Sequence, residues 1–276
     1  MTRLSVARWT DVECGPGPVL VVPLGSLEQH GPHLPLATDS LAAAAVCERL
    51  HELRPDAALA PVLPLGASGE HCAFPGTLSI GTQALAGVLV ELVRDAARTW
   101  PSVLVVNGHG GNATALGEAA RTCAAEGRRL VVHHLRLPGA DAHAGRTETS
   151  LLLHLAPESV DLALAAPGVT TPLPALLPRL VAEGVRSVSP SGVLGDPTGA
   201  SATEGRVLFG RLVSAAVAAY DAAARSPRSR QAAAGAAVTR GDPAVGQAPR
   251  APGNRTFGSN APGRRPADAL TSTPLP

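Results

Sequence analysis

Short and long apolar segments alternate along the first 225 residues, and this pattern predicts strands that alternate with helices. Residues 18–25 (PVLVVPLG) form a short run that is rich in β-branched side chains and ends at a glycine, as a buried strand does. Residues 82–100 show the apolar repeat of an amphipathic helix. Further strands are expected at 58–66, where two prolines weaken the pattern, and at 102–108 and 128–137. Further helices are expected at 39–53, 112–127, 147–157 and, after a proline-rich connection, 200–224.

This order of elements predicts an α/β fold with a mainly parallel sheet and helices on both of its faces. Thr38 or Asp39 is placed to cap the helix at 39–53, and Asn112 and Gly127 bound the helix at 112–127. Ligands of such folds bind beyond the carboxyl ends of the strands. The segment GSLEQHGPH follows the strand at 18–25, and NGHGGN follows the strand at 102–108. We therefore expect both segments at one edge of the sheet.

Composition divides the chain into a domain over residues 1–225 and a tail over 226–276. The tail is rich in Pro, Gly, Ala and Arg and has too few apolar side chains to offset the entropy of ordering, so we expect it to be disordered. It carries seven Arg and two Asp, a net charge of +5, which leaves about −4 on residues 1–225 of a chain with a total of +1. A mildly acidic domain argues against a nucleic-acid partner.

The four cysteines and the apolar segments bear on the compartment. Cys14, Cys47, Cys72 and Cys123 form no CxxC pair, which fits a reducing cytoplasm better than a disulfide framework. The first residues lack the uninterrupted apolar core of a signal peptide, and no apolar stretch reaches the roughly 18–20 residues that span a membrane. We expect a cytoplasmic protein without a membrane partner.

Five side chains at the predicted strand ends form a candidate metal site. They are three carboxylates and two imidazoles: Glu28, His30, Asp39, His109 and Glu148. Such nitrogen and oxygen donors suit Zn²⁺, Mn²⁺ or Fe²⁺. Two ions about 3.5–4 Å apart that share a carboxylate would activate water at neutral pH.

Each candidate also has a purely structural interpretation. Asp39 alone is more readily a helix cap, and Glu148 near a helix start could only complement the helix dipole. His30 and His109 taken singly could be hydrogen-bonded loop residues. Their common place at one predicted edge of the sheet favours the metal site.

Five segments resemble, in order, the signature blocks of the creatininase family of metal-dependent amidohydrolases. They are GSLEQHGPHLPLATD, GASGEHCAFPGTLSI, VVNGHGGN, HAGRTETSLLLHL and GVLGDPTGASATEGR, and the resemblance runs from about residue 18 to 222. It implies a three-layer α/β/α sandwich with a mainly parallel central sheet, a site for two divalent metal ions and often a hexamer. It also implies that Glu28, His30, Asp39, His109 and Glu148 bind the metals, with Asp39 as the bridge.

The resemblance implies roles for further residues. His143 matches the proton-transferring histidine, and Glu148 is counted beside it as a catalytic residue. The backbone N–H groups of Gly110 and Gly111 are expected at the oxyanion. His33 and Asn112 are expected to orient ligands, although His33 could equally satisfy a loop carbonyl. His71 could line the pocket with Ser68 and Phe74, whereas 74–76 could be only a structural turn.

Two departures from the family pattern argue against creatinine as substrate. Members that open creatinine carry a metal-binding glutamate where this chain has Gly111, and Glu148 is the natural replacement. Those members also close tryptophans over the substrate, but Trp9 and Trp100 lie outside the quoted segments.

Within the family, the chain is most similar to the peptidases of the mycofactocin system, which remove a C-terminal Val-Tyr dipeptide from a modified precursor peptide. That precursor peptide is therefore the expected partner. Another amidohydrolase of the family, cleaving a formamide or a cyclic amide, is the alternative. A catalytically silent metal-binding scaffold is a third, disfavoured because all five ligands and His143 are present.

Overall fold

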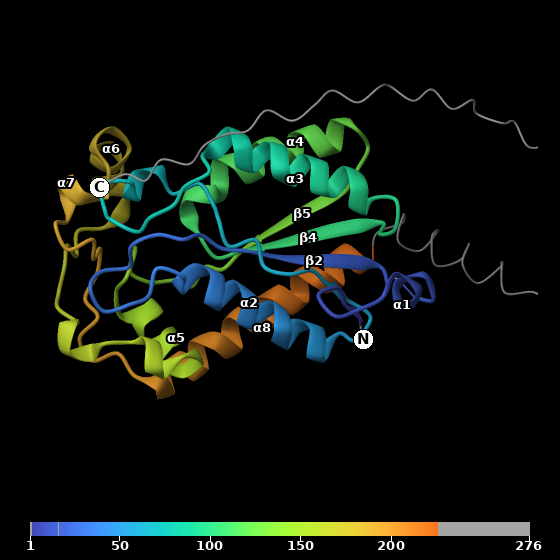
Figure 1. Cartoon of the computed structure of the whole chain (residues 1–276). Coiled ribbons are helices and arrows are strands. Elements are labelled where there is room, and N and C mark those ends of the chain that lie inside the picture. Colours follow the sequence, from blue (N-terminus) through green and yellow to red (C-terminus); the bar gives the residue numbers. More distant parts are fainter. Residues whose placement is uncertain (1, 16, 226–276) are drawn as a thin grey trace, which may run out of the picture. The chain divides into compact units, whose positions relative to one another are not determined.

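The computed structural model, which describes residues 2–15 and 17–225, has a five-stranded parallel sheet at its centre (Figure 1). The strand order is β1-β3-β2-β4-β5. Strands β2 (Val19–Leu24) and β4 (Ser102–Asn107) pair along their whole length and are buried at every position. The flanking strands are β1 (Thr2–Arg3), β3 (Ala58–Leu59) and β5 (Leu130–His134).

Helices cover both faces of this sheet and make a three-layer α/β/α sandwich, as predicted. Alternate side chains of a strand point to opposite faces. Leu20 and Val22 of β2 pack in the cluster under α3 (Thr82–Ala96) and α4 (Ala113–Ala125). Val19 and Val21 pack in the cluster on the other face. That face is covered by α2 (Thr38–Leu53), α5 (Arg146–Leu155) and α8 (Ala202–Ala224).

Several short elements and one helix lie outside the predicted pattern. The proline-rich connection contains α6 (Leu173–Glu183), which starts after Pro172 and holds Pro178 within it. Its Leu176 and Leu180 pack with Val185 and Leu194 in a small separate cluster. The other elements are α1 (Trp9–Glu13), α7 (Val185–Val188), and the 3₁₀ turns η1 (Gly69–His71), η2 (Gly110–Asn112), η3 (Pro157–Ser159) and η4 (Leu162–Leu164).

The predicted strand at 58–66 is shorter than expected. Regular pairing is confined to Ala58–Leu59, because Pro61 and Pro64 have no N–H group to donate. The segment nevertheless stays beside β2, since Leu63 exchanges main-chain hydrogen bonds with Pro23 and Gly25. The predicted tail at 226–276 lies outside the described residues.

Asn112 and Gly127 bound α4 as predicted, but the predicted side-chain caps of α2 and α4 are not made. Ala37 occupies the N-cap position of α2, and Asp39 lies inside the first turn without capping it. Asn112 does occupy the N-cap position of α4, but its side chain makes no capping bond. It accepts a hydrogen bond from the N–H of Ala67 and donates to the carbonyl of Gly25. Both side chains therefore serve contacts between loops rather than their own helices.

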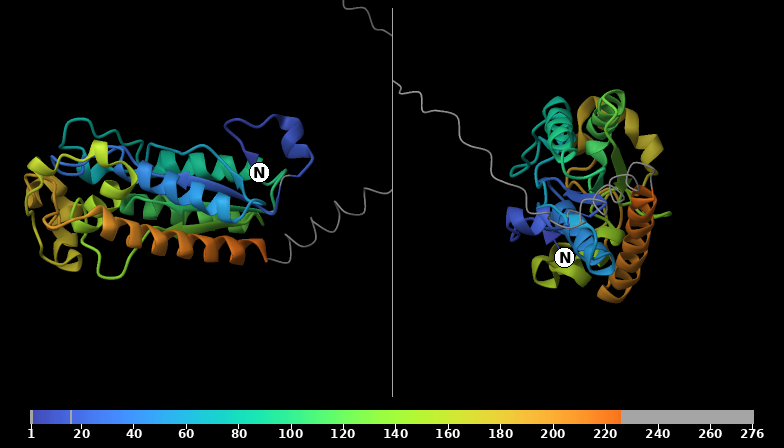
Figure 2. Two further views of the ribbon diagram at one scale, coloured as in Figure 1. Left: turned by 90° about the horizontal axis from the view of Figure 1, so that it is seen from below. Right: turned by 90° about the vertical axis from the view of Figure 1, so that its right-hand side faces the viewer.

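Helix α8 corrects the expectation that no segment is long and apolar enough to span a membrane. By length and composition alone, α8 is long and apolar enough to do so. In this fold, however, it packs beside α2 and α5 as part of one helical layer (Figure 2). Leu212, Val213, Ala216 and Tyr220 of α8 belong to the core cluster on that face. One face of α8 is therefore part of the core of this domain.

Candidate metal centre

Two neighbouring strand ends and one helix start bring the predicted segments together. Leu24 at the end of β2 pairs with Asn107 at the end of β4, so the loops that follow leave the sheet side by side. Gly25 and Gly108 begin these loops. A Cβ atom on Gly25 would lie 2.4 Å from the Cα atom of Ser40, and one on Gly108 would lie 2.6 Å from the carbonyl oxygen of Asp39. The absence of these Cβ atoms lets the first turn of α2 pack against both strand ends.

Asp39 lies between two histidines, with one carboxylate oxygen toward each. Its Oδ1 is 3.3 Å from Nε2 of His30, and its Oδ2 is 3.4 Å from Nδ1 of His109. The hydroxyl of Ser26 donates a hydrogen bond to Oδ2 over 2.6 Å. All four side chains are buried. A carboxylate in this position is arranged as a bridge between two ligand groups.

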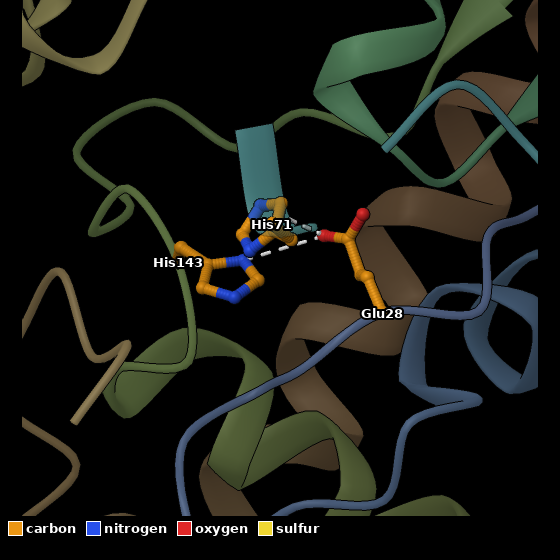
Figure 3. A group of neighbouring side chains, drawn as sticks. All are labelled: Glu28, His71 and His143. Atoms are coloured by element: carbon orange, nitrogen blue, oxygen red, sulfur yellow. Dashed lines mark ion pairs between the residues drawn. The ribbon is translucent and has the colours of Figure 1, made fainter. Parts of the chain in front are cut away.

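Glu28 is buried and surrounded by imidazoles. Its Oε2 is 3.1 Å from Nε2 of His109, and its Oε1 is 3.3 Å from Nε2 of His71 and 3.8 Å from Nδ1 of His143. Figure 3 shows His71 and His143 both directed toward this carboxylate. Neither oxygen of Glu28 has a hydrogen bond of regular geometry. A buried carboxylate without hydrogen bonds is costly unless a positive charge faces it.

Glu148, at the start of α5, completes the ligand set on the His30 side. Its Oε2 lies 3.9 Å from Nε2 of His30 and accepts a hydrogen bond from the N–H of Ala144 over 2.6 Å. Among the described residues, Ala144 is the one non-glycine residue with a positive φ, 52°. The Glu148 side chain is 28% exposed, so it marks the side of the site that is open to solvent.

The site favours positive charge. Burial alone would lower the pKa of His30, but the Asp39 carboxylate beside it raises that pKa to about 10. Burial opposes charge on His109 as well, yet Glu28 and Asp39 hold its pKa well above the usual value. Conversely, the pKa of Glu28 falls to about 2 despite burial, because His109 stabilises its charge. Glu28 and Asp39 thus remain ionised and can neutralise a cation, whereas burial raises the pKa of Glu148 to about 7.

His143 and His71 behave differently from the two histidines beside Asp39. Burial, together with the positive charge of His30, lowers the pKa of His143 well below its usual value. Burial also lowers the pKa of His71 to about 4, with His109 adding to the effect. Both rings are therefore neutral at neutral pH. The side chain of Gln29 lies between them, with its Nε2 atom 2.8 Å from Nδ1 of His71 and 3.1 Å from Nε2 of His143.

The remaining predicted residues lie around this cluster. His33 contacts the hydroxyl of Thr149 over 2.9 Å, which ties the loop after β2 to α5. Asn112 connects loops behind the site, as described above. Gly110 and Gly111 follow His109 in the turn η2. Phe74 packs in the α6 cluster and lies under the guanidinium of Arg186, as a structural element would.

Three residues of the cluster were not expected from the sequence. Ser26 donates to Asp39, Gln29 contacts two histidines, and Glu70 lies 3.5 Å from Nε2 of His109. Gln29 stands between two predicted ligands and Glu70 precedes His71, so their places in the quoted segments were a usable signal. A serine after a strand carries no such signal.

The residues present fit a metal site. Three overlapping groups each offer one nitrogen or oxygen atom per residue within 4.8 Å of the others: Glu28 with Asp39 and His109, His30 with His143 and Glu148, and Glu28 with His71 and His143. Neutral imidazole and carboxylate are the donors that Zn²⁺, Fe²⁺ and Mn²⁺ accept. The buried carboxylate of Glu28 lacks hydrogen bonds, so a bound cation would stabilise its negative charge.

Sequence comparison finds similar proteins over most of the chain. The creatininase family model, described as creatinine amidohydrolase, matches residues 6–220. The mycofactocin precursor peptide peptidase of Mycolicibacterium smegmatis is 49% identical over 201 residues, which are 71% of this chain and 81% of that protein. The corresponding peptidase of Mycobacterium ulcerans is 50% identical over 204 residues. The creatinine amidohydrolase of Pseudomonas putida is 32% identical over 176 residues, 52% of this chain.

Solved structures of creatininases share the fold. A structure described as creatininase Mn has a TM-score of 0.68 and 26% identity, covering 79% of this chain and 96% of that one. A mutant creatininase of the Zn-Zn type has a TM-score of 0.67 and 27% identity, covering 78% and 95%. Both are described as metal forms, and both share the fold of this chain.

Proposed function

The chain belongs to the creatininase family, and on that premise we propose that it is the metal-dependent peptidase that removes the C-terminal Val-Tyr dipeptide from the modified mycofactocin precursor peptide. Members of the family hydrolyse C–N bonds, and identity of about 49% to peptidases of this system favours a peptide substrate. Redox-cofactor biosynthesis is the process served. The substrate is thus a short modified peptide rather than creatinine.

One observation carries the metal part of the proposal: Asp39 presents one oxygen toward His30 and the other toward His109. We propose two divalent ions per subunit. Glu28, Asp39 and His109 would hold one, and His30, Asp39 and Glu148 would hold the other. Zn²⁺ and Fe²⁺ are the first candidates, with Mn²⁺ as a further one. The Mn and Zn-Zn forms among similar creatininases support divalent ions of this kind.

In the proposed mechanism, the metals supply the Lewis acidity that activates water and polarises the scissile carbonyl. His143 moves the proton. Its Nε2 lies 2.8 Å from the main-chain carbonyl of Gln29, which can only accept, so Nε2 carries the hydrogen and Nδ1 is free toward Glu28. Nδ1 can take a proton from the attacking water and deliver it to the leaving amine. The N–H groups of Gly110 and Gly111 stabilise the oxyanion.

The positions of the tryptophans support a substrate other than creatinine. Trp100 lies two residues before the start of β4. It is therefore at the amino end of this strand, whereas Asn107 and the site are at the carboxyl end. Trp9, in α1, is 74% exposed, and α1 lies at the end of the sheet away from α5 and α6 (Figure 1). Among the described residues, no tryptophan side chain can therefore close over the metal centre.

We propose that the enzyme acts in the cytoplasm as a homo-oligomer, with a hexamer as the expected form from the family resemblance. The four cysteines form no CxxC pair in the sequence, which fits a reducing compartment. Neither proposal is needed for the chemistry of one site.

The test is to load the protein with Zn²⁺, Fe²⁺ or Mn²⁺, add the modified precursor peptide, and follow release of Val-Tyr by mass spectrometry. His109→Ala removes a ligand and serves as the inactive control. His143→Gln removes the proton carrier and leaves the proposed ligands in place. Release by the wild type, lost in both variants, is the expected result.

Absence of Val-Tyr release with all three metals, from protein shown to contain two ions, would overturn the substrate. The unmodified peptide and N-formyl compounds would then be assayed with the same preparation, because hydrolysis of either would keep the amidohydrolase chemistry and change only the substrate class.

A further inference from the structure

Glu70 lies against the metal centre, although it is not one of the five predicted ligands. It belongs to the turn η1, directly before His71. Its Oε1 is 3.5 Å from Nε2 of His109, the same nitrogen that lies 3.1 Å from Glu28. Glu70 thus brings a further carboxylate to the group formed by Glu28, Asp39 and His109.

The backbone at Gly111 leaves room for this carboxylate. A Cβ atom on residue 111 would lie 2.4 Å from Oε1 of Glu70, 2.3 Å from Nε2 of His109 and 2.5 Å from the carbonyl oxygen of Ala67. Any larger residue would therefore displace either the Glu70 carboxylate or the His109 ring. The space beside His109 is occupied by the side chain of Glu70, supplied from a different loop.

The environment of Glu70 fits a ligand that completes the site at its rim. Its side chain is 31% exposed, whereas Glu28 is fully buried. Burial raises the pKa of Glu70, although the positive charge of His109 opposes the shift. The Glu70 carboxylate has one imidazole neighbour, His109, so a divalent cation beside it would stabilise its charge. Carboxylate oxygens bind such ions at about 2.0–2.2 Å.

We propose that Glu70 is an additional carboxylate ligand of the ion held by Glu28, Asp39 and His109, and that Gly111 is the position that admits it. The proposal rests on the metal centre proposed above. It adds a fourth protein donor to that ion and leaves the His30 and Glu148 side unchanged.

The test is the affinity for Co²⁺, followed by visible absorption during titration of the metal-free protein, together with metal content after gel filtration. Loss of a partner outside the ligand shell typically weakens metal binding about 10–100-fold, so loss of a direct ligand should weaken one ion at least about 100-fold. Glu70→Gln keeps the size of the side chain and removes its charge. Glu158→Gln, an exposed residue in η3, removes the same charge as the matched control.

The expected result is that Glu70→Gln loses one tightly bound ion while Glu158→Gln keeps both. Glu70→Asp should recover part of the affinity, because it restores the charge on a shorter stem. Wild-type affinity for both ions in Glu70→Gln would overturn the proposal. His109→Ala distinguishes this failure from failure of the whole centre: if that variant also keeps both ions, the metal centre itself is misplaced.

Discussion

The ring of His143 is hydrogen-bonded to the main chain of Gln29, with 2.8 Å between Nε2 and the carbonyl oxygen. The side chain of Gln29 is fixed in turn, because its Oε1 accepts a hydrogen bond from the N–H of Gly31. Its amide nitrogen therefore faces the two histidines, and it can donate to Nδ1 of His71. One residue between the proposed ligands Glu28 and His30 thus orients both neutral imidazoles.

The first prediction concerns His143. His143→Gln should lower the rate of peptide cleavage by about 10²–10⁴-fold, the range that general acid–base catalysis contributes. Metal content should stay at the wild-type level, because Glu28, Asp39 and His109 are untouched. The measurements are steady-state cleavage and metal analysis on the same preparation. A variant that loses an ion along with activity would instead make His143 a ligand, as its grouping with His30 and Glu148 allows.

The second prediction concerns Ser26, which holds Asp39 by a 2.6 Å hydrogen bond. Among the described residues, Ser26 has the only hydroxyl group that donates to Oδ2 of Asp39, and Ser26→Ala removes it. It should weaken metal binding about 10–100-fold, as removal of such supporting groups does. Ser214→Ala, an exposed serine that donates within α8, is the matched control and should bind metal as the wild type does. Equal affinity in both variants would show that Asp39 needs no support from Ser26.

Much of the sandwich was predictable because the strands and helices differ in hydrophobic period. β2 and α3 begin within one residue of the predicted segments, and the buried run of β4 was expected as it is found. α6 was not expected, because its prolines suggested a connection. Pro174 stands in the first turn, where proline is tolerated, and Leu176 and Leu180 pack inward although Pro178 lies within the helix. Prolines weaken a local signal without deciding the tertiary packing.

The site was predictable where residues stand at strand ends, and less so where loops meet. His109 and Glu28 were expected at one edge of the sheet, and they lie 3.1 Å apart. Their roles as ligands stay predictions. Glu148 was expected to replace the carboxylate missing at Gly111, and this role stays a prediction. The space beside Gly111 is filled by Glu70, which was not expected there. Sequence spacing cannot reveal this, because η1 and η2 meet only in the folded chain.

The third prediction concerns pH and the pair of Arg54 with Asp221, which joins α2 to α8 through two hydrogen bonds of 2.7 Å. The Arg54 side chain lowers the pKa of Asp221 below its usual value. A lowered pKa contributes stability above the unfolded-state pKa of about 4, and this contribution is lost as the pH falls. Asp221→Asn should therefore lower the melting temperature slightly at about pH 7, and by less at about pH 4.

A matched control exists for this pair on α3. Asp95 also faces an arginine, Arg98, but at 3.4 Å and with a side chain that is 80% exposed. Asp95→Asn should leave the melting temperature unchanged at either pH, because such exposed pairs contribute little. A pH-independent effect of Asp221→Asn would assign its contribution to packing rather than to charge.

The fourth prediction compares two glycines of α8. A Cβ atom on Gly205 would lie 1.8 Å from the carbonyl oxygen of Ser150 in α5, so Gly205 permits the close contact of these helices. Gly205→Ala should destabilise the fold by about 1–3 kcal/mol, the usual cost of overpacking. A Cβ atom on Gly210 meets nothing within 4 Å. Gly210→Ala should stabilise the fold by up to about 1 kcal/mol, because alanine loses less backbone entropy in a helix.

The pair of variants also connects packing to the metal centre. α5 carries Glu148 two residues before Ser150, so a shift of α5 away from α8 moves a proposed ligand away from His30. Gly205→Ala should therefore weaken binding of the ion on the His30 side, whereas Gly210→Ala should leave it unchanged. Thermal unfolding of the metal-free proteins gives the packing effect, and Co²⁺ titration gives the effect on the site. Destabilisation of Gly205→Ala without any change in metal affinity would mean that the loop at Ala144, and not the contact of α5 with α8, sets the position of Glu148.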